Sequence, residues 1–168
     1  MKNRPLVQNF GQGGGFVGWL SFGLWGLLTL YGLRRPKRRR AVRWASAAGL
    51  AVSMAGQETL LIQEGLWNLQ TGLPLHLCGM MGLCSLPLLS LRPRGLLGFS
   101  LLLGAPCAFL ALCFPAVIDC SRPFLMRLHF NRLHSLIVWT AVFSLGEDSK
   151  PLTLGETRKT LLWASGYA

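Results

Sequence analysis

The chain consists of long apolar runs separated by short segments rich in arginine and lysine. The first run, residues 16–33, is uncharged and has 18 residues, close to the minimum that a helix needs to cross a bilayer. Charged residues make up only 14% of the chain, against about 25% in soluble domains. The pattern therefore predicts an integral membrane protein.

The apolar runs predict an all-α, polytopic transmembrane helix bundle, because a chain inside a bilayer must bond its own backbone groups. We expect one transmembrane domain over residues 1–168, with five full spans at 16–33, 42–62, 73–91, 96–118 and 123–145. The clean apolar part of the last run is too short to cross alone, so that span must begin near Pro123. Residues 158–168 resemble the opening of a further, incomplete helix.

The positive charge is concentrated in one loop. The net charge is +11, and residues 34–43 (RRPKRRRAVR) lie directly between two apolar runs. This position favours contact with anionic lipid headgroups over nucleic-acid binding. Basic loops stay in the cytoplasm. We therefore expect a cell-membrane protein with its N-terminus outside and the Arg34–Arg43 loop in the cytoplasm.

Polar residues in the fifth run are candidates for a functional site. On a helix, Arg127, Asn131 and His134 lie within about 60° of one another, whereas His129 projects elsewhere. Ionisable residues at membrane depth are costly and usually face the interior of a bundle. A second interpretation stays open, in which residues 122–132 lie in the membrane interface as an amphipathic segment.

The third run opens with the sequence LPLHLC, which places His76 and Cys78 near the mouth of a span. Cys78 shares a helical face with Gly82 and Ser85, and His76 points away from that face. In the fourth run, small side chains predict a close-packing stripe at Ser100, Gly104, Cys107 and Ala111. The sequence contains no CxxC, HExxH or P-loop motif, and we expect no cofactor.

Several of these segments together resemble the YwaF-type bacterial membrane proteins, a family described only as conserved membrane proteins of unknown function. The resemblance rests on GLWN, LPLHLC, GAPCAFLALCFP (Gly104–Pro115) and the His-bearing helix that follows, and it covers about residues 57–145. A more remote similarity links that family to membrane acyltransferases and to the androgen-induced-gene lipid hydrolases. Those enzymes use a Cys or Thr nucleophile and a His inside a helical bundle.

The resemblance implies Cys78 and His134 as the catalytic pair. The polar side chains themselves suggest His76, Arg127, His129 and Asn131 as binding residues. Three functions stay open: a multi-pass membrane protein whose role the sequence does not reveal, an intramembrane lipid acyltransferase or hydrolase acting on a lipid substrate, and metal or haem binding through the histidines. His129 and His134 are about 140° apart on a helix, which counts against a shared metal.

Overall fold

The computed structural model describes residues 14–68, 77–114 and 121–148, with four isolated positions beyond them. These residues form helices and no strand: α1 (Gly14–Arg34), the 3-10 turn η1 (Pro36–Arg38), α2 (Arg39–Gln63), α3 (Leu77–Leu91), α4 (Arg94–Phe99), the π-helical turn η2 (Ser100–Gly104), α5 (Ala105–Cys113) and α6 (Pro123–Glu147). The predicted all-α class is confirmed. The predicted sixth helix, 158–168, lies almost entirely outside the described residues.

The helix ends follow from local sequence. Pro36 excludes the α conformation at the residue before it, and Arg35 accordingly adopts φ −122° and ψ 86°, which separates α1 from α2. At the other end of α2, Gly65 has φ +68°. The Leu66 N–H bonds the Leu61 carbonyl at 3.0 Å and the Gly65 N–H bonds the Ile62 carbonyl at 3.1 Å, the Schellman arrangement that closes a helix.

The helix in the region of the fourth predicted span contains the π-helical turn η2. Residues 94–113 run through α4, η2 and α5 without a break. Pro106 has no N–H and its ring crowds the preceding turn, and a π turn relieves this by admitting one more residue. That extra residue shifts the helical face. The buried positions are therefore Ser100, Gly104 and Ala108, whereas Cys107 and Ala111 of the expected stripe are half-buried.

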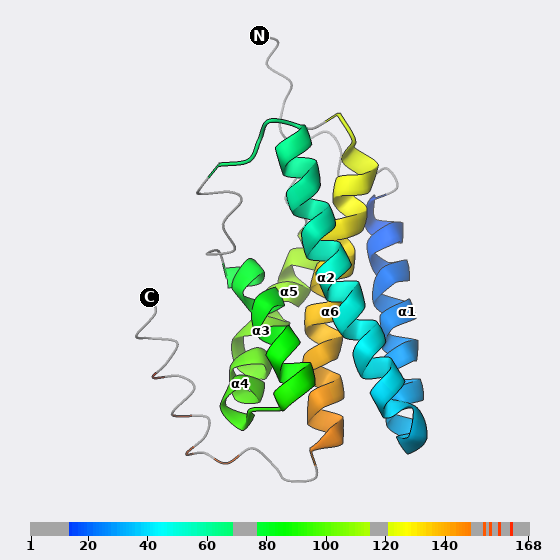
Figure 1. Ribbon diagram of the computed structural model, residues 1–168, viewed down its shortest axis with the longest axis vertical. Helices are drawn as coiled ribbons and strands as arrows, with labels where there is room; N and C mark the ends of the chain where they lie inside the picture. The colour runs from blue at the N-terminus through cyan, green and yellow to red at the C-terminus, as the bar shows by residue number, and fades with distance from the viewer. Residues whose placement is uncertain are drawn as a thin grey trace.

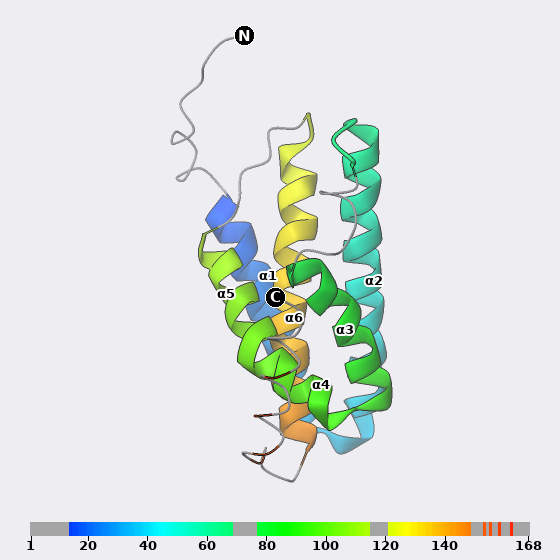
Figure 2. The ribbon, with the colours of Figure 1, turned by 90° about the vertical axis from the view of Figure 1, so that its left-hand side faces the viewer.

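Helix α6 is the central element of the bundle. It contacts α1, α2, α3, α5 and η2. In Figure 1 it lies between α1 and α5, and Figure 2 shows α1 and α5 on one side of it and α2 and α3 on the other. Its inner turns are buried at nearly every position from Asn131 to Phe143. The core forms where residues of α6 such as Leu136 and Ile137 meet Leu50 of α2 and Met81 of α3.

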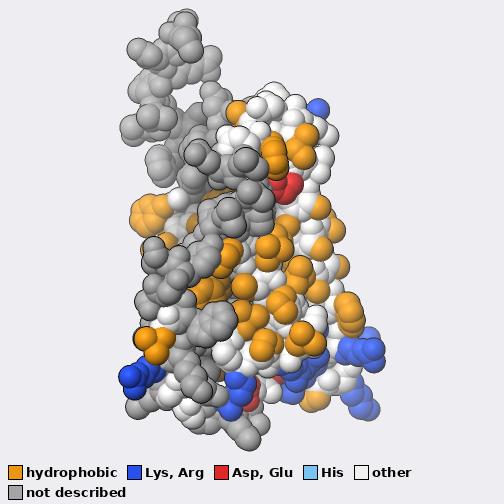
Figure 3. Space-filling model, turned by 60° about the vertical axis from the view of Figure 1, so that its left-hand side comes forward, with side chains coloured by type: hydrophobic (Ala, Val, Ile, Leu, Met, Phe, Trp, Pro, Cys, Tyr) orange, Lys and Arg blue, Asp and Glu red, His pale blue; other side chains and the backbone are white. Residues whose placement is uncertain are grey.

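Two of the described helices, Phe16–Arg34 and Arg94–Cys113, are long and apolar enough to cross a membrane, and Cys78–Leu91 is a shorter apolar helix. Large hydrophobic side chains of α1 are exposed, including Phe16, Leu24 and Leu27. Hydrophobic side chains also cover the middle of the face drawn in Figure 3, with lysine and arginine gathered at its lower end. The helices thus present an apolar belt above a basic end.

Candidate functional site

Helix α6 buries two of the predicted site residues. Asn131 and His134 are only 4% and 3% exposed. Asn131 lies against α1, where a Cβ added to Gly18 would meet its Nδ2 at 3.2 Å. Asn131 and His134 both point into protein, as the bundle-interior interpretation expects, whereas residues 122–125 at the start of the segment are exposed.

The ring of His134 is held by its own helix. Its Nδ1 lies 2.7 Å from the Phe130 carbonyl oxygen, and the centroids of the Phe130 and His134 rings are 4.0 Å apart. A carbonyl oxygen can only accept a hydrogen bond, so Nδ1 carries the proton in this contact. In the neutral imidazole the lone pair then lies on Nε2, the atom that could accept a proton from another group.

Cys78 lies in the first turn of α3 and is half-buried. The first N–H groups of a helix have no acceptor within the helix, and Cys78 lies among them. Since α3 packs against α6, the two predicted catalytic residues belong to neighbouring helices.

The other predicted binding residues are distributed over different surfaces. Arg127 is half-buried, and His129 faces α2, where a Cβ added to Gly56 would come within 2.3 Å of its ring. His129 Nδ1 is buried without a hydrogen-bond partner, and so is Oε1 of Gln57, the residue that follows Gly56 in the sequence. His76 lies outside the described residues. The helical wheel assigned His129 to a face away from the site, and the structure covers that face with another helix.

No group of three or more His, Cys, Asp or Glu side chains that could hold a metal ion occurs in the described part of the chain. His129 and His134 project from different faces of α6, as their spacing predicts. The metal or haem hypothesis therefore has no geometric support among these residues.

Sequence reasoning missed a cluster of charged residues at the basic end of the bundle. Glu147, whose side chain is 5% exposed, accepts hydrogen bonds from Arg43 Nη2 at 2.9 and 3.1 Å and from Arg92 Nη2 at 3.0 and 3.1 Å. Arg94 Nε pairs with the neighbouring Asp148 at 3.3 Å. The signal in the sequence was that acidic side chains are rare, 6 in all, and two of them are adjacent at the end of α6.

The basic run divides into structural and exposed members. Arg39 Nη2 donates to the Leu33 carbonyl at 3.3 Å, and Arg43 belongs to the Glu147 cluster. The exposed members are Arg34, Arg35, Lys37, Arg38 and Arg40. Only these five present their side chains outward, where lipid headgroups could reach them.

At the opposite end, a short connection ties α2 to the start of α6. Glu64 accepts hydrogen bonds from the Ser121 hydroxyl and, at 2.8 Å, from the Ser121 N–H. Arg122 Nη1 donates to Gln63 Oε1 at 2.6 Å. Both hydrogen bonds from Ser121 lower the pKa of the Glu64 carboxyl, because both favour its ionised form. The bond from the hydroxyl has the larger effect and the bond from the N–H the smaller one.

Comparison with protein families places residues 16–168 in the TMEM164 family. Because the match covers most of the chain, the protein belongs to this family of membrane proteins. Comparison with curated proteins and with solved structures found no match. The membrane class expected from the sequence is confirmed, whereas the resemblance to YwaF-type proteins and to lipid acyltransferases stays a prediction.

Proposed function

We propose that this member of the TMEM164 family is a multi-pass protein of the cell membrane that transfers or hydrolyses lipid acyl groups. The place of α6 supports the proposed multi-pass arrangement. A central helix need not be apolar, because its neighbours and not lipid cover it. The exposed apolar residues of α1 supply the outer surface that acyl chains would contact.

The observation that carries the proposed activity is the state of His134. A buried imidazole whose Nδ1–H is held by the Phe130 carbonyl has its lone pair on Nε2. An imidazole in this tautomer can act as a general base toward a group within hydrogen-bond reach of Nε2. Cys78 on the adjacent helix is the nucleophile in this scheme, and the N–H groups of the first turn of α3 are suited to stabilise an oxyanion.

The proposed reaction has two steps. The Cys78 sulfur attacks the ester carbonyl carbon of a phospholipid while His134 takes the thiol proton. The carbon–oxygen bond breaks, the lysolipid oxygen receives that proton, and a thioester forms on Cys78. An acceptor hydroxyl, from another lysolipid or from water, then gives its proton to His134 and attacks the thioester carbon. The acyl group leaves with the acceptor, and the Cys78 thiol is restored.

The test uses the full chain in vesicles of phosphatidylcholine with an isotope-labelled acyl chain. Intact-mass measurement should find a labelled, hydroxylamine-sensitive adduct on the protein, and labelled acyl groups should reach added lysolipid. The variant Cys78→Ala should lose both signals. The matched control Cys84→Ala, also half-buried on α3, should keep them. The variant His134→Ala should slow transfer at least 100-fold.

Two results would overturn the proposed activity. One is an adduct that persists in Cys78→Ala, and the other is an equal loss of activity in Cys78→Ala and Cys84→Ala. Circular dichroism and thermal melting in detergent, measured on each variant, separate a lost reaction from a lost fold.

We also propose that the exposed arginines of η1 and its flanks bind anionic headgroups on the cytoplasmic side, with the N-terminus outside.

A further inference from the structure

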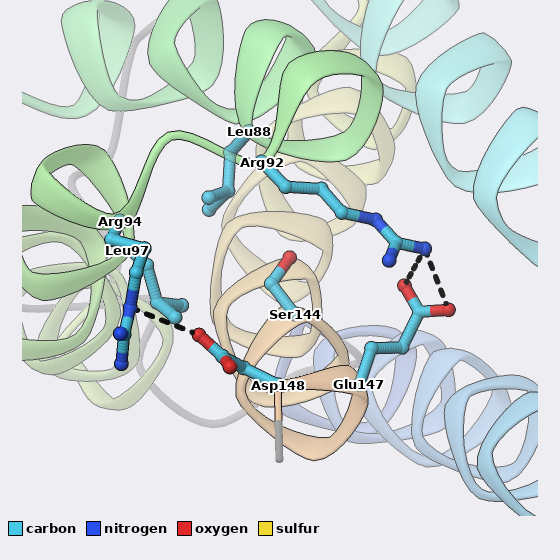
Figure 4. A pocket seen from close by; sticks show the side chains of 7 residues that line it. All are labelled: Leu88, Arg92, Arg94, Leu97, Ser144, Glu147 and Asp148. Atoms are coloured by element: carbon cyan, nitrogen blue, oxygen red, sulfur yellow. Dashed lines mark hydrogen bonds and ion pairs between the residues drawn. The ribbon is translucent and has the colours of Figure 1, made fainter. Parts of the chain in front are cut away.

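A cavity of about 330 Å³ opens at the basic end of the bundle, between the α3–α4 turn and the end of α6. Figure 4 shows its arrangement: the Arg92–Glu147 pair lies on one side, the Arg94–Asp148 pair lies on the other, and the Ser144 side chain lies between them. Leu88 and Leu97 complete the lining. The cavity thus combines two cations, two anions, a hydroxyl and two apolar side chains.

The backbone of the α3–α4 turn directs both arginines into this space. Arg92 has φ +54°, a conformation that costs a non-glycine residue free energy, and the following Pro93 opens α4. Arg92 uses a single nitrogen, Nη2, for both contacts with Glu147. Its side chain remains 48% exposed and that of Arg94 remains 35% exposed. Both guanidinium groups are therefore accessible from the cavity side.

The pattern of charge restricts what can bind. Glu147 is already paired with both Arg43 and Arg92, so the cluster has three arginines against two carboxylates and attracts an anion. An anion beside Arg94, however, would also lie near the Asp148 carboxylate. A simple cation would meet the two guanidinium groups in the same way. A ligand with a negative and a positive group on one short chain can satisfy both sets, because each charge then lies beside its opposite.

Size and position narrow the ligand further. The volume is near the lower limit for small-molecule sites, about 300–1,000 Å³, so it suits a headgroup and not a whole lipid. Leu88 and Leu97 would contact the apolar part of such a ligand. The site is separate from the proposed acyl-transfer site, because Arg92 lies 14 residues beyond Cys78 on the α3 side, about 21 Å along a helix.

We propose that this cavity binds a zwitterionic phosphodiester, with the phosphate beside Arg92, Arg94 and the Ser144 hydroxyl and the cationic group beside Asp148. The chemistry is that of a zwitterionic lipid headgroup or of the free glycerophosphodiester. Planar guanidinium groups are suited to phosphate oxygens. Glu147 holds Arg92 in place through two hydrogen bonds. The proposal does not depend on the acyl-transfer activity.

The experiment is calorimetric titration of the full chain in uncharged detergent with four probes. These are dihexanoylphosphatidylcholine below its micelle concentration, glycerophosphocholine, dihexanoylphosphatidylglycerol and inorganic phosphate. At least one of the two choline compounds should bind at least tenfold more tightly than the phosphatidylglycerol and the phosphate. Tighter binding of the lipid identifies a membrane headgroup as the source, and tighter binding of glycerophosphocholine identifies a soluble diester.

The variants Arg94→Gln and Asp148→Asn should each weaken choline-compound binding at least tenfold. The control Arg122→Gln removes an exposed arginine charge at the opposite end of the bundle and should leave binding unchanged. If an ion-pair variant fails to fold, Ser144→Leu, which fills the cavity and spares both pairs, should abolish binding without lowering the melting temperature. The proposal is overturned if phosphatidylglycerol or phosphate binds as tightly as both choline compounds, or if Ser144→Leu binds like the parent.

Discussion

At the scale of single residues, a close contact between α2 and α6 depends on Gly56. A Cβ at this position would come within 2.3 Å of the His129 ring, and a ring cannot bend away as a flexible chain end can. We therefore expect Gly56→Ala to destabilise the protein by about 1–3 kcal/mol. Thermal melting in detergent should show the loss as a lower melting temperature.

The control for this change is Gly23→Ala in α1, where an added Cβ would meet no atom within 4 Å. Alanine has the higher helix propensity, so this variant should melt at the same temperature or slightly higher, with a gain of up to about 1 kcal/mol. Equal melting of Gly56→Ala and the parent would show that His129 does not pack over Gly56.

A second residue-scale prediction concerns pH. Ser121 lowers the pKa of Glu64, so the Glu64 carboxylate binds a proton less tightly in the folded protein than in the unfolded chain. The resulting stabilisation is complete above the ordinary carboxyl pKa of 4.5 and is lost as the pH falls through the lowered folded value. Melting curves from pH 7 to pH 3 should therefore show an acid-dependent decrease that is smaller in Ser121→Ala.

The comparison for Ser121→Ala is Ser90→Ala. The Ser90 hydroxyl bonds only the Leu86 carbonyl of its own helix, at 3.0 Å. Its removal should leave the acid dependence as it is in the parent. The ¹³C chemical shift of the Glu64 carboxyl, followed against pH, measures the pKa of this group directly. That pKa should rise toward the ordinary value in Ser121→Ala. No rise would contradict the role given to Ser121.

At the scale of elements, the contact between η2 and α3 leaves little space for a side chain at Gly104. A Cβ on Gly104 would lie 2.2 Å from Met81 Cε, and Met81 is 1% exposed, so it has little room to move. We expect Gly104→Leu to destabilise the bundle by about 1–3 kcal/mol. Thermal melting in detergent measures the difference.

Two further variants make this prediction specific. Gly95→Leu places the same side chain in α4, where an added Cβ would meet nothing within 4 Å, and it should have little effect. Met81→Ala combined with Gly104→Leu should recover part of the lost stability, because the first change makes room for the second. A parent-like melt of Gly104→Leu alone would show that η2 and α3 do not pack through this glycine.

At the scale of the whole molecule, the testable property is orientation. The basic loop should be cytoplasmic and the N-terminus outside. In a chain whose native cysteines are replaced, an impermeant maleimide added to intact cells should label Gln8→Cys and spare Arg38→Cys. After the cells are permeabilised, both should react. Labelling of position 38 in intact cells would reverse the orientation.

Much of the helical layout could be predicted from the sequence alone. The run at 16–33 corresponds to α1, and that at 123–145 lies within α6, because apolar length and prolines are local properties of the chain. The fourth run corresponds to Arg94–Cys113, and its burial pattern differed from the expected stripe. The π turn before Pro106 adds a residue that a fixed 100° rotation does not include.

The sequence by itself determined the membrane class and the helical fold, because both follow from hydropathy and from the need of a chain in hydrocarbon to bond its own backbone groups. It left two positions open for Asn131, in the bundle interior or at the membrane interface. Only the tertiary structure decided which helix is central. A helical wheel gives a helix one inner face, but α6 is surrounded, so even His129 meets another helix. The Glu147 cluster has the same origin: Arg43 and Glu147 are 104 residues apart, and only packing brings such residues together.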